Sequence, residues 1–292
     1  MSWPGKAEAH ASIAVGCMRL GLWGAAMSTS ELQAFIEGCL EAGADIFDHA
    51  DIYGDYTTEA EFGAVLKGKS SLRDSMLLIS KCGIMMPADA RPQIKLKGYD
   101  TSREHIVQSA EQTLENLATD RLDLLLIHRP DMLMDPAEIA EAFEALRSSG
   151  KVLAFGVSNF TASQLRALHS CWPDLLVNQV ELSPTHRDPF LDGTLDQCLE
   201  WGIRPMAWSP MAGGQLFQQA DIMKVLEELA AKYGVAVDTL IYAWLMRHPS
   251  KPMPVTGSSK LERIKSALRA SELEISREDW YAIWTAAGGL VP

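Results

Sequence analysis

The stretch LDLLLIH, Leu122–His128, decides the fold class. Apart from Asp123 it is apolar as far as Ile127, so both faces of an extended strand here would be apolar. Such a strand is typical of a parallel sheet, which helices cover on one side and a packed interior fills on the other. Seven further runs of strand length are spread along the chain, at residues 15–20, 45–48, 76–81, 152–158, 176–181, 204–208 and 253–256.

Stretches with helical periodicity separate these runs. One apolar stripe, at the spacing of a helix face, consists of Leu32, Phe35, Ile36, Cys39 and Leu40. Capping-box patterns, which mark helix starts, occur at residues 28–31, 101–104, 161–164 and 259–262. The alternation of eight strands with helices predicts an α/β fold, a (β/α)8 TIM barrel, with residues 1–292 as a single domain. A doubly wound sheet is the second interpretation, but it usually carries a G-x-G-x-x-G turn, and the sequence has none.

The composition is that of a globular protein, and its charge argues against two classes of partner. Of the 292 residues, 47% are hydrophobic and 22% are charged, and the net charge is −12. Nucleic acids and anionic membranes bind basic faces, so we expect neither as a partner. The five cysteines include no Cys-x-x-Cys pair, and Arg19 interrupts the apolar stretch 12–27. We therefore expect free thiols, no signal peptide or membrane span, and a cytoplasmic location.

Reactive side chains end or follow three of the expected strands. Asp48 ends the run 45–48 and Tyr53 follows it, while Lys81 and His128 end two later runs. Barrel enzymes carry their reactive groups at these carboxyl ends, so we expect the four side chains to meet. An ammonium lowers the pKa of a neighbouring phenol, a carboxylate holds the ammonium, and a neutral imidazole orients a carbonyl. This set is suited to carbonyl reduction, provided that a cofactor delivers hydride.

Two other chemistries use parts of this pattern. A metal ion at the barrel top could be held by His49, Asp51, His128 and Glu181. The sequence has no His-x-His, however, and Lys81 would place an ammonium at that position, so we expect no metal. A short-chain dehydrogenase also pairs Tyr with Lys, but at a spacing of four residues, where this sequence has Thr57.

Six motifs occur in order along most of the chain. They are DHADIYG (48–54), LLISKCG (77–83), LDLLLIHRPD (122–131), GKVLAFGVSNF (150–160), NQVELSP (178–184) and MAWSPMAGG (206–214). Their joint occurrence resembles the aldo/keto reductase family, and the variant with His49 and IHRPD looks like a bacterial oxidoreductase branch of it. The resemblance implies an NADPH-dependent oxidoreductase that reduces aldehydes or ketones to alcohols.

The same resemblance assigns roles to the reactive residues and names a cofactor site. Tyr53 would be the proton donor, Lys81 would lower its pKa and pair with Asp48, and His128 would orient the substrate carbonyl. Ser158, Asn159 and Gln179 match contacts to the nicotinamide carboxamide, and Trp208 matches an aromatic residue that stacks on the nicotinamide. The remaining matches, several of them in the loop that passes over the pyrophosphate, are Met18, Arg19, Asp48, Ser209, Met211, Gly213 and Gly214.

The segment VTGSSKLERI, residues 255–264, is expected to bind the 2′-phosphate of NADPH. A helix N-terminus has free N–H groups that bind anions. The expected contacts are Gly257, Ser258, Ser259, Lys260 and Arg263, and the arginine is the physical reason to expect NADPH in preference to NADH. Many family members have Lys at Gly257 and Asn at Ala267, so binding depends more heavily on Arg263 and Lys260.

Five residues that follow strand ends are expected to line the pocket of a small carbonyl substrate: Trp23, Ile52, Ile84, Arg129 and Phe160. Packing at the barrel top is the alternative interpretation for each. Arg129 either attracts a carboxylate or phosphate of the substrate or pairs with Asp131. His49 stands where the family usually has Thr, which we interpret as a variation in packing or hydrogen bonding; a place in the pocket lining is the alternative. The alternative function is an NADP(H)-binding, redox-sensing partner protein with little turnover, and we expect a monomer or weak homo-oligomer.

Overall fold

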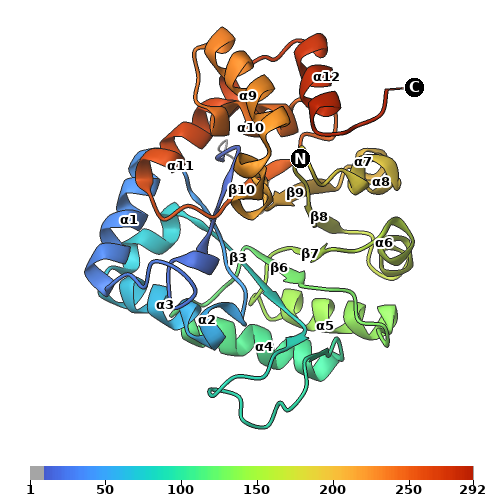
Figure 1. Ribbon diagram of the computed structural model, residues 1–292. Helices are drawn as coiled ribbons and strands as arrows, with labels where there is room; N and C mark the ends of the chain where they lie inside the picture. Colours follow the sequence, from blue (N-terminus) through green and yellow to red (C-terminus); the bar gives the residue numbers. More distant parts are fainter. Residues whose placement is uncertain (1–9, 292) are drawn as a thin grey trace.

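The computed structural model describes residues 10–291 and arranges eight parallel strands in a closed barrel (Figure 1). The order around the barrel is β1, β10, β9, β8, β7, β6, β3 and β2. Their bounds are β1 Ala14–Gly16, β2 Ile46–Asp48, β3 Leu77–Cys82, β6 Leu124–Ile127, β7 Phe155–Ser158, β8 Leu175–Glu181, β9 Arg204–Trp208 and β10 Met253–Thr256. The predicted (β/α)8 barrel is confirmed.

A ring of helices surrounds the strands (Figure 1). The α-helices are α1 Thr29–Glu41, α2 Tyr53–Tyr56, α3 Thr58–Gly68, α4 Arg103–Asn116, α5 Pro136–Ser148, α6 Ala162–His169, α7 Asp188–Leu191, α8 Thr194–Trp201, α9 Ala220–Tyr233, α10 Val237–Met246, α11 Leu261–Leu268 and α12 Arg277–Ala286. Short 3-10 helices occur at η1 Cys17–Arg19, η2 Ser70–Ser75, η3 Ala212–Gln218 and η4 Arg269–Glu272. No helix in the described part of the chain is long and apolar enough to cross a membrane.

Within the LDLLLIH stretch, Leu124–Ile127 form β6, whose side chains belong to two apolar layers. Leu124 and Leu126 belong to the cluster inside the barrel, whereas Leu125 and Ile127 belong to the cluster between barrel and helices. Side chains alternate along a strand, so a strand with two buried faces needs this uninterrupted apolar run. Asp123, the exception, accepts hydrogen bonds from the backbone N–H of Leu78 (2.8 Å) and from Nη2 of Arg73 (2.9 Å). Both interactions fasten the start of β6 to the neighbouring segment.

Two of the four predicted capping boxes form. Ser28 caps α1 and Thr161 caps α6, each reciprocally with the residue three positions later. The prediction at 101–104 is wrong by one residue, because Ser102 caps α4 by accepting from the N–H of His105. The prediction at 259–262 is wrong, because α11 begins after Lys260 and has no side-chain cap.

The first strand is shorter than predicted, and a hairpin was not predicted. The run 15–20 leaves the sheet after Gly16, because the neighbouring strands β2 and β10 end at Asp48 and Thr256, and residues 17–19 turn into η1. The hairpin pairs β4 (Ile84–Met85) with β5 (Gly98–Tyr99). The long loop between these strands extends beyond the helix ring (Figure 1, teal). Both departures lie at the carboxyl ends of the barrel strands, where they supply walls to the cavity described below.

Candidate active site

A buried lysine lies at the centre of the site. Lys81, in β3, is 0% exposed, and its Nζ lies 2.7 Å from Oδ2 of Asp48, 2.7 Å from the backbone oxygen of His49 and 3.0 Å from the hydroxyl of Tyr53. An ammonium has three N–H donors, and each one here has an acceptor. Burial alone would lower the pKa of Lys81, but the charge of Asp48 and the contact with Tyr53 outweigh it and raise the pKa above its ordinary value. Lys81 therefore carries its proton at neutral pH.

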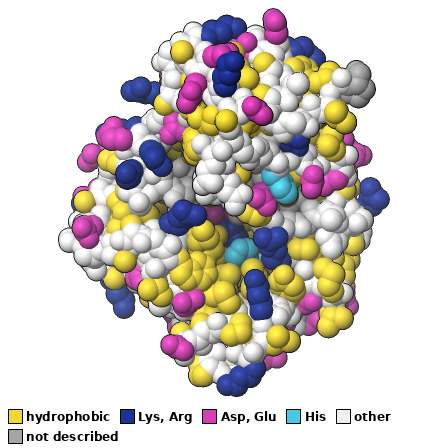
Figure 2. Space-filling model, viewed as in Figure 1, with side chains coloured by type: hydrophobic (Ala, Val, Ile, Leu, Met, Phe, Trp, Pro, Cys, Tyr) yellow, Lys and Arg dark blue, Asp and Glu magenta, His cyan; other side chains and the backbone are white. Residues whose placement is uncertain are grey.

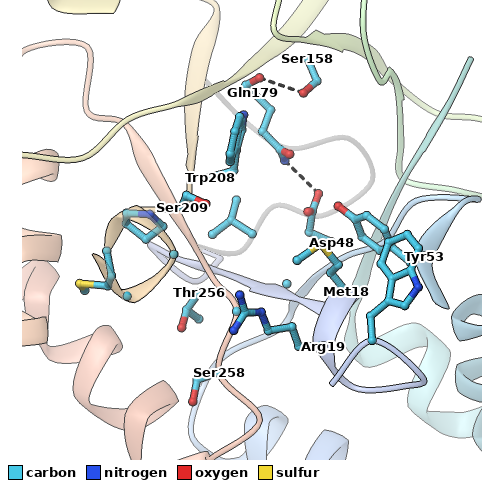
Figure 3. Close-up of a pocket in the computed structure, with 18 of the residues that line it drawn as sticks. Met18, Arg19, Asp48, Tyr53, Ser158, Gln179, Trp208, Ser209, Thr256 and Ser258 are labelled. Carbon is cyan, nitrogen blue, oxygen red and sulfur yellow. Dashed lines mark hydrogen bonds between the residues drawn. The ribbon is translucent and has the colours of Figure 1, made fainter. Parts of the chain in front are cut away.

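Asp48 is held on both carboxylate oxygens. It ends β2, and its Oδ1 accepts a hydrogen bond from Nε2 of Gln179 at 3.0 Å (Figure 3). Gln179 lies in β8, so the bond crosses the mouth of the barrel. Because both oxygens are engaged, the carboxylate cannot rotate without breaking an ion pair or a buried hydrogen bond.

Tyr53 reaches Lys81 because the chain turns sharply after β2. Tyr53 begins α2, in which Gly54 and Asp55 have left-handed backbone angles (φ 60° and 56°). A Cβ on Gly54 would lie 2.4 Å from Oγ1 of Thr58, so this turn requires glycine. Burial raises the pKa of Tyr53, and the charge of Lys81 opposes this rise without cancelling it. Lys81 therefore lowers the pKa of Tyr53 as expected, but burial raises it by more, so the net shift is upward and Tyr53 carries its proton at neutral pH.

His128 follows β6 and stands beside Tyr53. The two rings meet edge to face, with centroids 6.0 Å apart. Burial, followed by the charges of Lys81, Arg129 and Lys97, lowers the pKa of His128 well below its ordinary value. The imidazole is therefore neutral at physiological pH, and neutral imidazole can donate a hydrogen bond through one nitrogen.

These groups lie at one side of a cavity of about 930 Å³. Figure 3 shows Tyr53 and Asp48 at one side, Ser209 at the opposite side and Ser258 near Thr256, while Figure 2 shows the hollow in the middle of this face. The cavity is lined by most of the residues predicted to bind cofactor or substrate: Met18, Arg19, Trp23, Asp48, Ile52, Tyr53, Ile84, His128, Arg129, Ser158, Asn159, Gln179, Trp208, Ser209, Met211, Gly213, Gly214, Gly257, Ser258 and Arg263. Lys81 lies beneath this lining.

A polar network links the ends of β7, β8 and β9. Ser158 donates to the backbone oxygen of Gln179 (2.9 Å), and the Asn159 amide donates to Ser158 Oγ (2.8 Å) and to the backbone oxygen of His128 (3.2 Å). The Trp208 indole N–H donates to Oδ1 of Asn159 (2.9 Å). The network fixes the orientation of the indole ring at the cavity wall, and it holds Asn159 in a left-handed conformation (φ 62°).

The loop after β9 has an unusual backbone. Ser209, Ala212, Gly213 and Gly214 all have positive φ, between 49° and 94°. Non-glycine residues rarely adopt this conformation, and such strain concentrates where a backbone contacts a ligand. Turns of this kind form concavities that suit an anionic ligand. The N–H groups of Ala212 and Gly214 already donate within the loop, to the backbone oxygens of Ser209 and Met211.

The cavity extends from this loop to the start of α11. Ser258 and the exposed Arg263 line that end together with Asp238, whose Oδ1 accepts from the N–H of Thr239 and the hydroxyl of Ser266. Arg263 has no ion-pair partner among residues 10–291. Its guanidinium is free to bind a phosphate.

Some predicted contacts lie elsewhere. Phe160 is 1% exposed and belongs to the core between barrel and helices, so it does not line the cavity. Ser259 and Lys260 lie outside the lining, because α11 begins beyond them. His49 is fully buried with its ring edge-on to Phe62 (centroids 4.6 Å apart), in line with the packing interpretation.

Sequence reasoning missed several lining residues. Lys97, Tyr99 and Met86 come from the β4–β5 hairpin and its loop, and Asp238 and Tyr242 come from α10. The hairpin was not predicted, and Asp238 and Tyr242 lie on a helix, so a rule based on the ends of predicted strands did not reach these residues. For the hairpin residues the sequence offered one signal, the unusually long stretch between the strands that form β3 and β6.

The ligand set considered for a metal ion is dispersed. His49 packs against Phe62, and Glu181 faces His186, with Oε2 3.9 Å from its Nδ1. Within residues 10–291, no three His, Cys, Asp or Glu side chains are grouped in a way that would hold a metal ion.

Comparisons with known proteins agree with the barrel fold. A sequence model described as the aldo/keto reductase family matches residues 12–287. Oxidoreductase YdhF of Escherichia coli (strain K12) is 48% identical over 280 residues, which are 94% of this chain and 93% of that protein. The 6-dehydroglucose reductase of Agrobacterium fabrum is 43% identical over 276 residues, 92% of this chain and 93% of its own length. A crystal structure of an aldo/keto reductase from Klebsiella pneumoniae, in complex with NADP and acetate, has a TM-score of 0.79 at 24% identity and covers 96% of this chain and 92% of that one.

Proposed function

This chain belongs to the aldo/keto reductase family, and from that premise we propose that it reduces an aldehyde or ketone to an alcohol with NADPH. The observation that carries the proposal is the contact of Lys81 Nζ with both Asp48 and Tyr53 at the wall of the cavity. A fully buried lysine with a buried carboxylate is costly to maintain, so a structural role alone explains it poorly.

The proposed role of Tyr53 is to transfer its hydroxyl proton to the carbonyl oxygen. Its pKa, raised by burial, keeps the proton in place until an oxygen with growing negative charge accepts it. Lys81 stabilises the phenolate that remains, and Asp48 balances the lysine charge. Neutral His128 orients the carbonyl by a hydrogen bond.

The residues around the cavity fit a nicotinamide dinucleotide phosphate. We assign the nicotinamide end to Ser158, Asn159, Gln179 and Trp208, whose polar network offers amide and hydroxyl groups beside an aromatic ring. The left-handed loop after β9 suits a pyrophosphate, and Arg263 suits a 2′-phosphate. When bound, the cofactor supplies the hydride that no side chain can provide. The carboxylate of Asp238 lines the same end of the cavity as Arg263 and would repel a phosphate. The preference for NADPH therefore depends on the positive charge of the arginine.

The reaction is tested by Tyr53→Phe. We expect this variant to lose carbonyl reduction almost completely while it binds NADPH with nearly unchanged affinity, because only the hydroxyl is removed. The matched control is Tyr99→Phe, which removes another phenol from the cavity lining. Activity is followed by NADPH oxidation with a panel of aldehydes, and affinity by fluorescence titration. Near-normal turnover of Tyr53→Phe refutes the role, and a wild-type protein that binds NADPH but reduces no carbonyl supports the redox-sensor alternative.

The cofactor preference is tested by Arg263→Ala. We expect the affinity for NADPH to fall by about tenfold or more, as for loss of a charged hydrogen bond, and the affinity for NADH to change little. Lys265→Ala removes a cation from the same helix, one that pairs with Glu262, and serves as the control. Equal losses for both cofactors would place the 2′-phosphate elsewhere.

A further inference from the structure

Two cations face the part of the cavity where His128 lies. Arg129 follows β6, and its guanidinium carbon lies 5.5 Å from the centre of the Trp208 ring. Lys97 comes from the loop before β5, and both side chains line the cavity. Both charges also lower the pKa of His128, although burial and the charge of Lys81 lower it by more. Two separate segments of the chain therefore direct positive charge to the place where the substrate carbonyl is expected.

Neither cation is neutralised by an acidic side chain within residues 10–291. The neighbouring acid Asp131 does not pair with Arg129, because its oxygens accept from the N–H of Leu133 (2.8 Å) and the hydroxyl of Thr101 (3.4 Å). Arg147 provides a contrast: it also lies over an indole, but it forms an ion pair with Asp174 at 3.0 Å. The stacked guanidinium of Arg129 therefore retains N–H donors for a ligand.

The charge of the cavity differs from that of the whole protein. Four Lys or Arg side chains line it, against two carboxylates, Asp48 and Asp238. Asp48 is already paired with Lys81, so the substrate end has a positive excess in a protein with a net charge of −12. Figure 2 shows dark blue side chains beside a histidine in this hollow. A cleft of one sign of charge concentrates ligands of the opposite sign.

We propose that Arg129 and Lys97 form a specificity site for carbonyl substrates that also carry a carboxylate, a phosphate or another anionic group. The proposal rests on the proposed function, because it places the carbonyl at Tyr53 and His128. Arg129 presents a planar fork of donors that matches carboxylate and phosphate oxygens, and its guanidinium lies over the Trp208 ring. Lys97, more exposed, adds a flexible point charge that draws the anion toward the cavity.

The test compares two aldehydes that differ in one charge, 4-carboxybenzaldehyde and its neutral methyl ester. We expect the wild-type chain to have the higher kcat/KM for the acid. Arg129→Gln is expected to lower kcat/KM for the acid by about tenfold or more, mainly through KM, and to change the value for the ester little. Lys97→Gln causes a smaller loss, and added salt weakens the preference for the acid. Lys95→Gln, which removes an exposed cation of the same loop outside the cavity, is the control and leaves both values unchanged.

Two outcomes overturn the anion site: a wild-type preference for the ester, or an equal loss for acid and ester in Arg129→Gln.

A second measurement separates this failure from failure of the proposed function. Calorimetry of the full chain with NADP⁺ compares the two product alcohols, 4-(hydroxymethyl)benzoate and its methyl ester. If neither these two aldehydes nor any other aldehyde of the panel is reduced, the proposed function fails. Tighter binding of the acid that depends on Arg129 still supports the anion site, and equal binding of both alcohols refutes it.

Discussion

Replacement of Lys81 by Met would measure how strongly the site is held together. The thioether has a similar length but no charge, so Asp48, which is 2% exposed, keeps only the Gln179 amide as a side-chain donor within residues 10–291. Removal of one partner of a buried ion pair costs about 3–5 kcal/mol, because the other charge stays buried without compensation. At roughly 2 °C per kcal/mol for a chain of this length, the Tm would fall by about 6–10 °C.

The double variant Asp48→Asn with Lys81→Met tests the reason for that loss. It removes both charges and leaves an amide that can still accept from Gln179, so we expect it to recover most of the lost stability. Thermal unfolding followed by circular dichroism measures all four proteins, and the result does not depend on catalysis. A cost of less than about 1 kcal/mol for Lys81→Met, or a loss in the double variant equal to the sum of the two single losses, would refute this role of the ion pair.

Three further predictions concern pH and packing. The kcat/KM for carbonyl reduction should stay flat from about pH 6 to about pH 9. Burial raises the pKa of Tyr53, and the pKa of His128 is lowered well below its ordinary value, so neither group titrates in this range. A bell-shaped pH profile centred near pH 7 would contradict this. The pKa of His49 is lowered by burial to about 3, so the unfolded chain binds the extra proton first and stability falls as the pH drops below the ordinary value of 6.5. Between about pH 7 and about pH 4, the free energy of unfolding should therefore fall by roughly 3 kcal/mol less in His49→Met than in wild type, as measured by urea unfolding. An identical fall in both proteins would refute the assignment. Gly63→Ala should lower the Tm strongly, because its Cβ would lie 1.9 Å from the backbone oxygen of Asn116, whereas Gly68→Ala in the same helix has open space and should be neutral or stabilising by up to about 1 kcal/mol.

Loop residues show where reading the sequence reached its limit. Asp48, Lys81 and His128 were found because each ends or follows a strand, and the ends of parallel barrel strands share one face. Lys97 and Asp238 reach the same cavity from a loop and from a helix, and no short-range pattern marks such positions. Phe160 follows a strand as the other pocket candidates do, yet packing turns it into the core.

The sequence by itself determined the barrel and predicted the candidate catalytic groups, because apolar periodicity and strand-end chemistry are local properties of the chain. Only the tertiary structure decided the protonation of those groups. The pKa of Tyr53 depends on a balance between burial and the charge of Lys81, 28 positions away, and burial prevails. The tertiary structure also decided that Arg129 lies over Trp208 and not beside Asp131. Desolvation and through-space charge depend on all the atoms packed around a group, and most of these atoms come from distant parts of the sequence.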